Sequence, residues 1–400
     1  MEAKNCAIAG TSDSREFNDV EAAVLQRYGN AAQEVEACLC LPVSYDEALL
    51  NVIPDEIVEK DYGCGDPSRH IRAGETVLDL GSGSGKACYI IAQIVGAQGK
   101  VIGVDFNPPM LELARKYQKS IGDQLGYHNV EFRRGKIQDL TTNLELVDRY
   151  LQDHPVRSVS DLAKLEAYEK EIRREQPLIA DESIDVIVSN CVLNLVRPQD
   201  KKVLFAEMYR VLKRSGRIVI SDIVSDEPVP EHLAQDPDLW SACVSGAFQE
   251  EDFLRAFEEA KFYGIQIEEL RSEAYQTVEG IEFRAITVTA YKGKEGPCIE
   301  RNQAVVYRGP WKQVVDDDGH TLPRGVRIAV CDKTFKLYSQ SPYQGQFILV
   351  PPRQEVPLDQ AGVFDCARDH KRDPRETKGV EFKVTSAAGG ACGLGSACCP

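Results

Sequence analysis

The sequence predicts a doubly wound α/β fold, in which helices cover both faces of a mostly parallel sheet. Near-continuous runs of Val, Ile and Leu alternate with segments of helical periodicity, and such runs are typical of parallel strands buried on both faces. The first of these runs leads through closely spaced glycines straight into a helical segment. With 400 residues, the chain is also long enough for two or three domains.

The predicted strands and helices alternate from residue 76 onward. The strands are 76–80, 100–105, 130–134, 183–189 and 217–222. The helices between them are 85–95, 109–124 and 198–213. Residues 141–176 repeat apolar positions at helical intervals, which predicts a helical insertion between the third and fourth strands. Further on, we expect a helix at 250–261 and two strands, 265–270 and 283–292, that finish the same sheet in antiparallel fashion.

The composition changes after residue 292, where Gly, Pro and charged residues become frequent. Short β-like runs at 304–307, 326–330 and 346–350 predict a small β-rich domain. Residues 386–400 are almost wholly Gly, Ala, Ser and Cys and cannot bury enough apolar surface to order themselves. The expected organisation has five parts: 1–60, 61–225, 226–293, 294–385 and 386–400.

The charge balance of the chain bears on its partners. With 47 basic and 63 acidic residues, the net charge is −16, which repels phosphate backbones and anionic membranes at long range. The sequence contains no apolar run of the roughly 20 residues that a spanning helix needs. We therefore expect a cytoplasmic protein that binds neither nucleic acid nor membranes. We also expect it to be a monomer and to act on a small molecule.

Glycines at 81, 83 and 85 separate the first predicted strand from the first predicted helix. Glycine allows a sharp turn and lets a ligand approach the backbone without meeting a Cβ atom. Twenty residues beyond Gly85, the second strand ends at Asp105, whose carboxylate can accept hydrogen bonds from both ribose hydroxyls. This combination predicts a ligand that contains adenosine.

The glycine spacing and Asp79 together predict S-adenosylmethionine as that ligand. Dinucleotide sites use G-x-G-x-x-G and rest a pyrophosphate on the helix N-terminus, whereas this chain has G-x-G-x-G preceded by Asp79. An acidic side chain at this place would repel a pyrophosphate and suits a sulfonium or ammonium cation. After the third strand, Ile137 and Gln138 either contact the adenine ring or belong to a plain turn.

Three cysteines are expected near the carboxyl ends of the strands, where ligands bind in an open α/β sheet. Cys191 follows the fourth strand, at a place where amino-methylating enzymes often carry a polar-Pro-Pro-aromatic loop. Cys64 precedes the first strand and Cys243 lies past the fifth. Because thiolates select soft ions over hard ones, three converging thiols would hold a soft, thiophilic centre. The total of 13 cysteines is odd, so they cannot all pair within one chain.

At the level of motifs, the chain resembles the arsenite S-adenosylmethionine methyltransferases over about residues 35–292. The segments that carry the resemblance are YGCG at 62–65, LDLGSGSG at 78–85, SNCVLNLV at 189–196 and ACVSGA at 242–247. The resemblance implies a Rossmann-like class I methyltransferase sheet with an added substrate-binding region. It also implies that arsenic(III) is bound by Cys64, Cys191 and Cys243.

The same resemblance implies further roles. An earlier cysteine acts in catalysis, and both Cys38 and Cys40 qualify, with Cys38 slightly favoured. Tyr62 lines the methyl face, and we place Asn190 with it among the cofactor-binding residues. In the family, arsenite is converted to mono-, di- and sometimes trimethyl products, and a disulfide formed during turnover is reduced by thioredoxin or glutathione.

Two other interpretations stay open. One is methylation of a different acceptor, such as a small thiol, because fold and cofactor do not fix the substrate. The other is a zinc or metalloid binding protein in which the same cysteines close a structural site. Cys88 lies in an apolar helical stripe and is expected in the core. No role is predicted for Cys298, Cys331 and Cys366.

Overall fold

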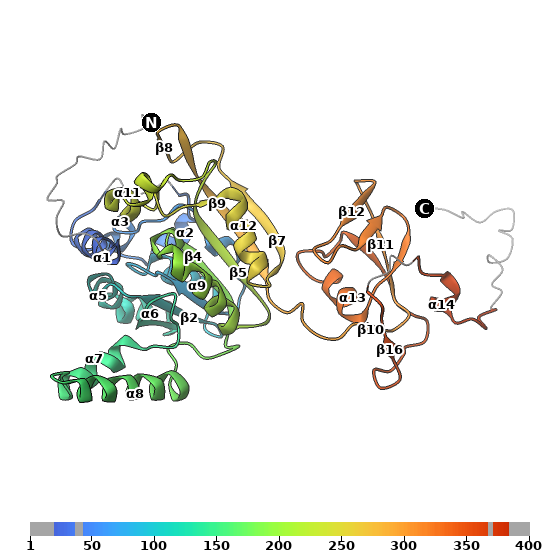
Figure 1. Ribbon diagram of the computed structural model, residues 1–400, viewed down its shortest axis with the longest axis horizontal. Helices are drawn as coiled ribbons and strands as arrows, with labels where there is room; N and C mark the ends of the chain where they lie inside the picture. Colours follow the sequence, from blue (N-terminus) through green and yellow to red (C-terminus); the bar gives the residue numbers. More distant parts are fainter. Residues whose placement is uncertain (1–19, 37–42, 367–370, 384–400) are drawn as a thin grey trace. The chain divides into compact units, whose positions relative to one another are not determined.

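The computed structural model describes residues 20–36, 43–366 and 371–383, and the chain forms two compact units that divide between Gly293 and Lys294 (Figure 1). The first unit carries the large sheet. The second is a small β-rich unit. Within the described residues, the helices are all too short or too polar to serve as a membrane span.

The large sheet has the strand order β3-β2-β1-β4-β5-β9-β7. Its members are β1 (Thr76–Leu80), β2 (Lys100–Asp105), β3 (Val130–Arg134), β4 (Ile184–Asn190), β5 (Leu212–Ser225), β7 (Tyr263–Leu270) and β9 (Ile281–Tyr291). The strands β3, β2, β1, β4 and β5 run parallel to one another. Strand β9 pairs with β5 and β7 in antiparallel fashion. The predicted doubly wound sheet and its antiparallel finish are confirmed.

Helices cover both faces of this sheet because side chains alternate along each buried strand. Val77 of β1 packs in one apolar cluster with α4 (Lys86–Val95) and α5 (Pro108–Lys116). Its neighbour Leu78 packs in the opposite cluster with α9 (Pro198–Val211) and α12 (Glu250–Glu259). The carboxyl ends of the parallel strands β1, β2 and β4 lie at one edge of the sheet.

Several elements differ from the expected pattern. The helix expected at 109–124 is divided at Tyr117 into α5 and α6 (Gln118–Leu125), and the Tyr117 hydroxyl donates to Glu56 Oε2 at 2.5 Å. The insertion is helical as predicted and consists of α7 (Leu144–Asp153) and α8 (Val159–Glu175). The helix expected at 198–213 ends at Val211 because the long strand β5 begins at the next residue.

Apart from the 12-residue helix α1, the remaining elements of the first unit are short. They are α1 (Val20–Ala31), α2 (Glu47–Leu50), α3 (Asp55–Glu59), η2 (Pro67–His70), η3 (Leu193–Leu195), α10 (Glu231–Ala234), α11 (Pro237–Ser241), β6 (Phe248–Gln249) and β8 (Gln276–Val278). The N-terminal helix α1 has no counterpart among the predicted elements. It contacts α11, α5 and η3, all of which border the free edge of the sheet.

The second unit is built on a three-stranded antiparallel sheet in the order β14-β11-β15. Its elements are β10 (Ile299–Glu300), β11 (Ala304–Tyr307), β12 (Gln313–Val315), β13 (Thr321–Pro323), β14 (Arg327–Ala329), α13 (Asp332–Tyr338), β15 (Phe347–Val350), β16 (Gly362–Val363) and α14 (Pro374–Lys378). The rings of Tyr338 and Phe347 stack with centroids 4.3 Å apart in its core. A small β-rich C-terminal region is therefore present, as predicted.

Candidate active site

The turn between β1 and α4 requires glycine at two positions. Gly81 and Gly85 have φ angles of 75° and 86°, a region that L-residues with side chains rarely adopt. A Cβ atom on Gly81 would lie 2.5 Å from Val192 Cγ1, and one on Gly85 would lie 2.7 Å from Phe132 Cζ. Gly83 has open space around its Cα and lines the adjacent pocket. Gly85 does not line the pocket, so its role is confined to the shape of the turn.

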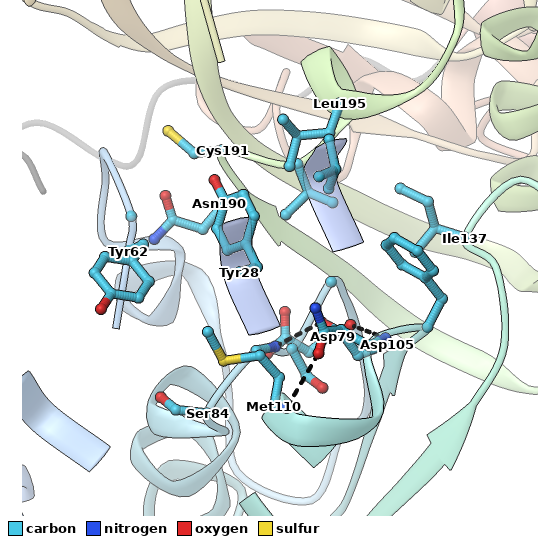
Figure 2. A pocket seen from close by; sticks show the side chains of 18 of the residues that line it. Tyr28, Tyr62, Asp79, Ser84, Asp105, Met110, Ile137, Asn190, Cys191 and Leu195 are labelled. Carbon is cyan, nitrogen blue, oxygen red and sulfur yellow. Dashed lines mark hydrogen bonds between the residues drawn. The ribbon is translucent and has the colours of Figure 1, made fainter. Parts of the chain in front are cut away.

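The pocket lies over the carboxyl ends of the central strands (Figure 2). Of the residues predicted to bind the cofactor, the lining includes Tyr62, Asp79, Gly81, Gly83, Asp105, Ile137, Gln138 and Asn190. Met110 of α5 and Val192 after β4 contribute apolar surface. Segments that are far apart in the sequence thus surround one cavity.

Two buried carboxyl groups face this pocket. Asp105 accepts hydrogen bonds from the backbone N–H groups of Gly83 at 2.9 Å and Asn107 at 2.8 Å, which fixes its orientation. Asp79 is 3% exposed and accepts a hydrogen bond from the Cys88 thiol at 3.2 Å. Burial raises the pKa of Asp79 to about 7, and the carboxylates of Asp61 and Asp105 act in the same direction. A bound cation would therefore favour the ionised form of Asp79.

The residues that line the pocket fit S-adenosylmethionine. The Ser82 hydroxyl is buried against the pocket and has no hydrogen-bond partner within the described residues, so it is available to a polar ligand. The space at Gly83 would be filled by a side chain. Asp79 and Asp105 supply acceptors for a cationic and a ribose group, respectively.

The N-terminal helix α1 closes one side of the pocket through Glu21, Val24 and Tyr28. Glu21 pairs with Lys136 at 2.7 Å, and Asn107 donates to the Leu25 carbonyl at 3.0 Å. The sequence analysis missed this helix and these lining residues. Helix α1 has apolar residues, but the contacts that place it at the pocket join segments about 80 to 115 residues apart in sequence, and a local sequence pattern does not reveal such contacts.

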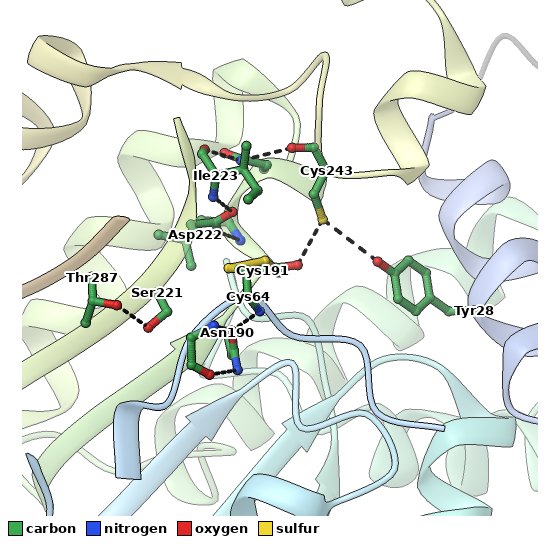
Figure 3. The surroundings of a disulfide bond; sticks show 12 residues. Tyr28, Cys64, Asn190, Cys191, Ser221, Asp222, Ile223, Cys243 and Thr287 are labelled. Atoms are coloured by element: carbon green, nitrogen blue, oxygen red, sulfur yellow. Dashed lines mark hydrogen bonds between the residues drawn. A yellow bond between two sulfur atoms is a disulfide. The ribbon is translucent and has the colours of Figure 1, made fainter. Parts of the chain in front are cut away.

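The three cysteines predicted at the sheet edge lie together (Figure 3). Cys64 and Cys191 form a disulfide with their Cα atoms 6.0 Å apart. The Cys243 thiol donates to the Cys191 carbonyl oxygen at 3.0 Å, and the Tyr28 hydroxyl lies 3.8 Å from the same sulfur. Cys191 also lines the cofactor pocket, so the thiol cluster borders it directly. Cys38 and Cys40 lie outside the described residues.

Both Cys191 and Cys243 have backbones in the left-handed region, with φ angles of 59° and 62°. Such strain persists only where the surroundings determine the conformation. The Cys191 N–H donates to the Ser221 carbonyl at 2.8 Å. The Asn194 side chain donates to the carbonyl oxygens of Ile223 at 2.6 Å and Cys243 at 3.2 Å. The two cysteine-bearing turns are therefore attached to β5 and to each other.

Asn190 holds the loop that carries Cys64. Its Oδ1 accepts hydrogen bonds from the N–H groups of Cys64 at 2.8 Å and Gly65 at 3.1 Å, and its Nδ2 donates to the Gly65 carbonyl at 2.8 Å. A Cβ atom on Gly63 would lie 2.4 Å from this amide. Asn190 lines the cofactor pocket, yet its polar atoms are directed at the cysteine loop. Tyr62 also lines the cofactor pocket, and its hydroxyl donates a hydrogen bond to the Ala31 carbonyl at 3.0 Å.

Replacement of Asn190 by alanine is expected to lower the rate of methyl transfer by about 10- to 100-fold, because its three hydrogen bonds to Cys64 and Gly65 are lost. S-adenosylmethionine affinity should change much less. Asn129→Ala is a matched control: its amide also bonds two carbonyls, those of Ala92 and Gly96, at the opposite edge of the sheet. Steady-state methylation rates and S-adenosylmethionine binding isotherms of both variants check this prediction. Equal rate losses in both variants would refute a positioning role for Asn190.

Burial is the main influence on the pKa of the Cys243 thiol. Burial, followed by the nearby Asp222 carboxylate, raises the pKa of Cys243 well above its ordinary value. Burial also raises the pKa of Asp222 to about 6, and its carboxylate accepts hydrogen bonds from the N–H groups of Leu193 and Ile223, each at 2.8 Å. Lys201 donates to the Gly246 carbonyl at 2.6 Å and so supports the Cys243 turn.

This sheet order, with a glycine turn and an acidic residue at the end of β2, defines a class I S-adenosylmethionine-dependent methyltransferase. A family model described as a methyltransferase domain matches residues 71–174 and 156–261. A second model, described as a domain of unknown function, matches residues 294–382.

Comparison with known proteins narrows this class. The chain is 32% identical to the arsenite methyltransferase of Aquipseudomonas alcaligenes over 311 residues, which are 75% of this chain and 80% of the relative. It is 26% identical to that of Mus musculus, over 96% of this chain and 99% of the relative. A solved arsenic(III) S-adenosylmethionine methyltransferase from Chlamydomonas reinhardtii matches with a TM-score of 0.51 and 28% identity, covering 81% of this chain and 100% of that structure. The chain belongs to the arsenite methyltransferase family.

Proposed function

We propose that this protein transfers methyl groups from S-adenosylmethionine to trivalent arsenic bound by Cys64, Cys191 and Cys243. The observation that carries the proposal is the meeting of these three residues at the border of a pocket fitted to the methyl donor. A protein whose cysteines only form a structural zinc site does not need a pocket for a methyl donor. A methyltransferase of small thiols does not need three of its own thiols beside that pocket.

The cofactor is bound by the residues of the pocket. When bound, S-adenosylmethionine supplies an electrophilic methyl group on a sulfonium centre. Asp79 offers a negative charge to the cationic part, and Asp105, held by Gly83 and Asn107, offers acceptors to the ribose. Ile137 supplies an apolar wall on the side of β3. The buried Ser82 hydroxyl is a further polar contact.

Arsenite reaches the cysteines as a neutral hydroxide with three As–O bonds. Each thiol replaces one hydroxyl group with release of water, so three neutral thiols bind arsenic without any net proton loss. A high pKa at Cys243 is compatible with this exchange. The rigid turns at Cys191 and Cys243 fix the arsenic lone pair in direction, which is the main requirement for a displacement at a methyl carbon.

Methyl transfer raises the formal oxidation state of arsenic from III to V. Two electrons return it to III when two As–S bonds break and the two sulfurs join in a disulfide, a step that we assign to Cys64 and Cys191, which are bonded in the structure. The disulfide must then be reduced by an external thiol, for which we propose a thioredoxin or glutathione system. We further propose that the protein works as a monomer in the cytoplasm, on arsenite and methylarsenite.

Purified protein incubated with arsenite, S-adenosylmethionine and a thiol is expected to give methylated arsenicals, measured by chromatography of arsenic species. Parallel reactions with small thiols as the only acceptors should give no S-methylated product above background. S-methylation of those thiols without methylation of arsenic would overturn the proposal and favour the other acceptor class.

A further inference from the structure

The C-terminal unit contains a second group of three cysteines. The sulfur atoms of Cys298, Cys331 and Cys366 all lie within 4.8 Å of one another. Cys298 directly precedes β10, Cys331 precedes α13 and Cys366 follows β16. The Phe364 N–H donates to the Cys298 carbonyl at 2.9 Å, which holds two of the three segments together.

All three thiols are free, and the group is both anchored and accessible. Cys331 is buried, and its sulfur accepts a hydrogen bond from the Thr334 N–H at 3.4 Å. Cys298 and Cys366 are only half-buried. An odd number of thiols cannot be consumed by pairing among themselves. A set of three with one buried and two accessible members is therefore suited to capture a ligand from solution.

We propose that Cys298, Cys331 and Cys366 form a second binding site for trivalent arsenic, separate from the methylation site. In its choice of ligand this inference rests on the proposed function. Its geometry is independent, because all three residues belong to the unit that begins at Lys294. They also lie within residues 294–382, which match a domain of unknown function.

The number of donors favours arsenic over zinc. Trivalent arsenic takes three sulfurs, and its lone pair occupies the fourth direction. Structural zinc sites almost always use four protein ligands. Within the described part of the chain, the cluster comprises three cysteines and includes no histidine, aspartate or glutamate as a fourth ligand. The three sulfurs among the described residues therefore match the three bonds that arsenic(III) forms.

The charge of the complex gives the same preference. Arsenic(III) bound to three thiolates is neutral, whereas zinc(II) bound to three thiolates carries a net negative charge. The cluster packs against the buried side chains of Ala329 and Phe364. A net charge beside apolar groups is unfavourable because the ion loses part of its hydration. The neutral arsenic complex avoids this cost.

The binding reaction balances without any further reactant. Three S–H bonds and three As–O bonds break, three As–S bonds form, and three hydroxyl groups leave as water with the thiol protons. No atom changes its oxidation state. The only requirement is that the thiols are reduced.

The test measures arsenic bound per chain. Reduced full-length protein is incubated with arsenite, freed of unbound arsenic and analysed by elemental mass spectrometry. We expect about two arsenic atoms per wild-type chain, one for each three-sulfur site. The variant C298S/C331S/C366S should retain about one, and the variant C191S/C243S should also retain about one. Arsenic X-ray absorption of the latter variant should show about three sulfur neighbours.

The two variants separate this inference from the proposed function. If C191S/C243S binds no arsenic, or if wild type and C298S/C331S/C366S bind the same amount, the second site is refuted. If C191S/C243S retains its arsenic while the wild type fails to methylate arsenite, the second site stands and the proposed function fails. Stoichiometric zinc that arsenite does not displace, or a disulfide between Cys298 and Cys366 in reduced protein, would also overturn the inference.

Folding of the variants is checked independently. The single variant Cys366→Ser changes one atom of a half-buried side chain, and its thermal unfolding should stay within a few degrees of wild type. It should nevertheless lose the second arsenic atom. Mass spectrometry of alkylated peptides gives a further readout: arsenite should protect Cys298, Cys331 and Cys366 together in wild type. Unprotected thiols there at saturating arsenite would contradict the site.

Discussion

Replacement of Cys191 by serine is expected to abolish methylation of arsenite, with a loss of about 100-fold or more. A serine hydroxyl is a hard donor that does not compete with water for arsenic. The variant also lacks the disulfide with Cys64 that would return electrons to arsenic. Chromatography of arsenic species after incubation with S-adenosylmethionine measures the effect. S-adenosylmethionine binding and thermal unfolding, both close to wild type, show that the fold is intact.

Cys64→Ser provides the informative comparison. Arsenite needs three sulfurs, but methylarsenite already carries one carbon and needs two. Cys191 and Cys243 can supply these from their fixed turns. The Cys64 variant should therefore fail with arsenite and keep part of the activity that starts from methylarsenite, with a disulfide between Cys191 and Cys243 taking the place of the Cys64–Cys191 bond. Full arsenite activity in Cys191→Ser would show that the assigned thiol set is wrong.

The parts of this fold that follow from local pattern could be predicted from the sequence. The strands β1, β2 and β3 have the predicted bounds: β1 and β2 are rich in Val, Leu and Ile, and β3 alternates Val130 and Phe132 with charged residues. The gathering of Cys191 and Cys243 followed from the rule that the carboxyl ends of parallel strands share one edge. These predictions needed only periodicity and chain order.

The parts that depend on distant contacts could not be predicted. Helix α1 is held at the site by Arg27, whose guanidinium donates to the Ser241 hydroxyl at 2.9 Å across 214 residues of sequence. The left-handed backbone conformations of Cys191 and Cys243 could not be predicted either, since Gly or Asn usually occupies such positions. The cluster of Cys298, Cys331 and Cys366 lacks the close Cys pairs that mark metal sites in sequences.

Replacement of Asp79 by asparagine is expected to weaken S-adenosylmethionine binding by about 10- to 100-fold, because a buried carboxylate facing a bound cation is lost. Asparagine keeps the size and can still accept the Cys88 hydrogen bond. Isothermal calorimetry measures the dissociation constant. 5′-Methylthioadenosine, which has neither sulfonium nor ammonium, serves as the neutral probe, and its affinity should barely change.

The same carboxyl group predicts a pH dependence with a defined sign. Burial holds the pKa of Asp79 at about 7 in the ligand-free protein, above its value of about 4 in an unfolded chain. The folded protein therefore keeps a proton that the unfolded chain has lost, and this group makes folding less favourable as pH rises from about 4 to 7. A bound cation stabilises the ionised form, so wild-type affinity for S-adenosylmethionine should increase between about pH 6 and 7.5, with proton release on binding. Asp79→Asn should flatten that part of the profile, and an unchanged profile would assign the titration to another group.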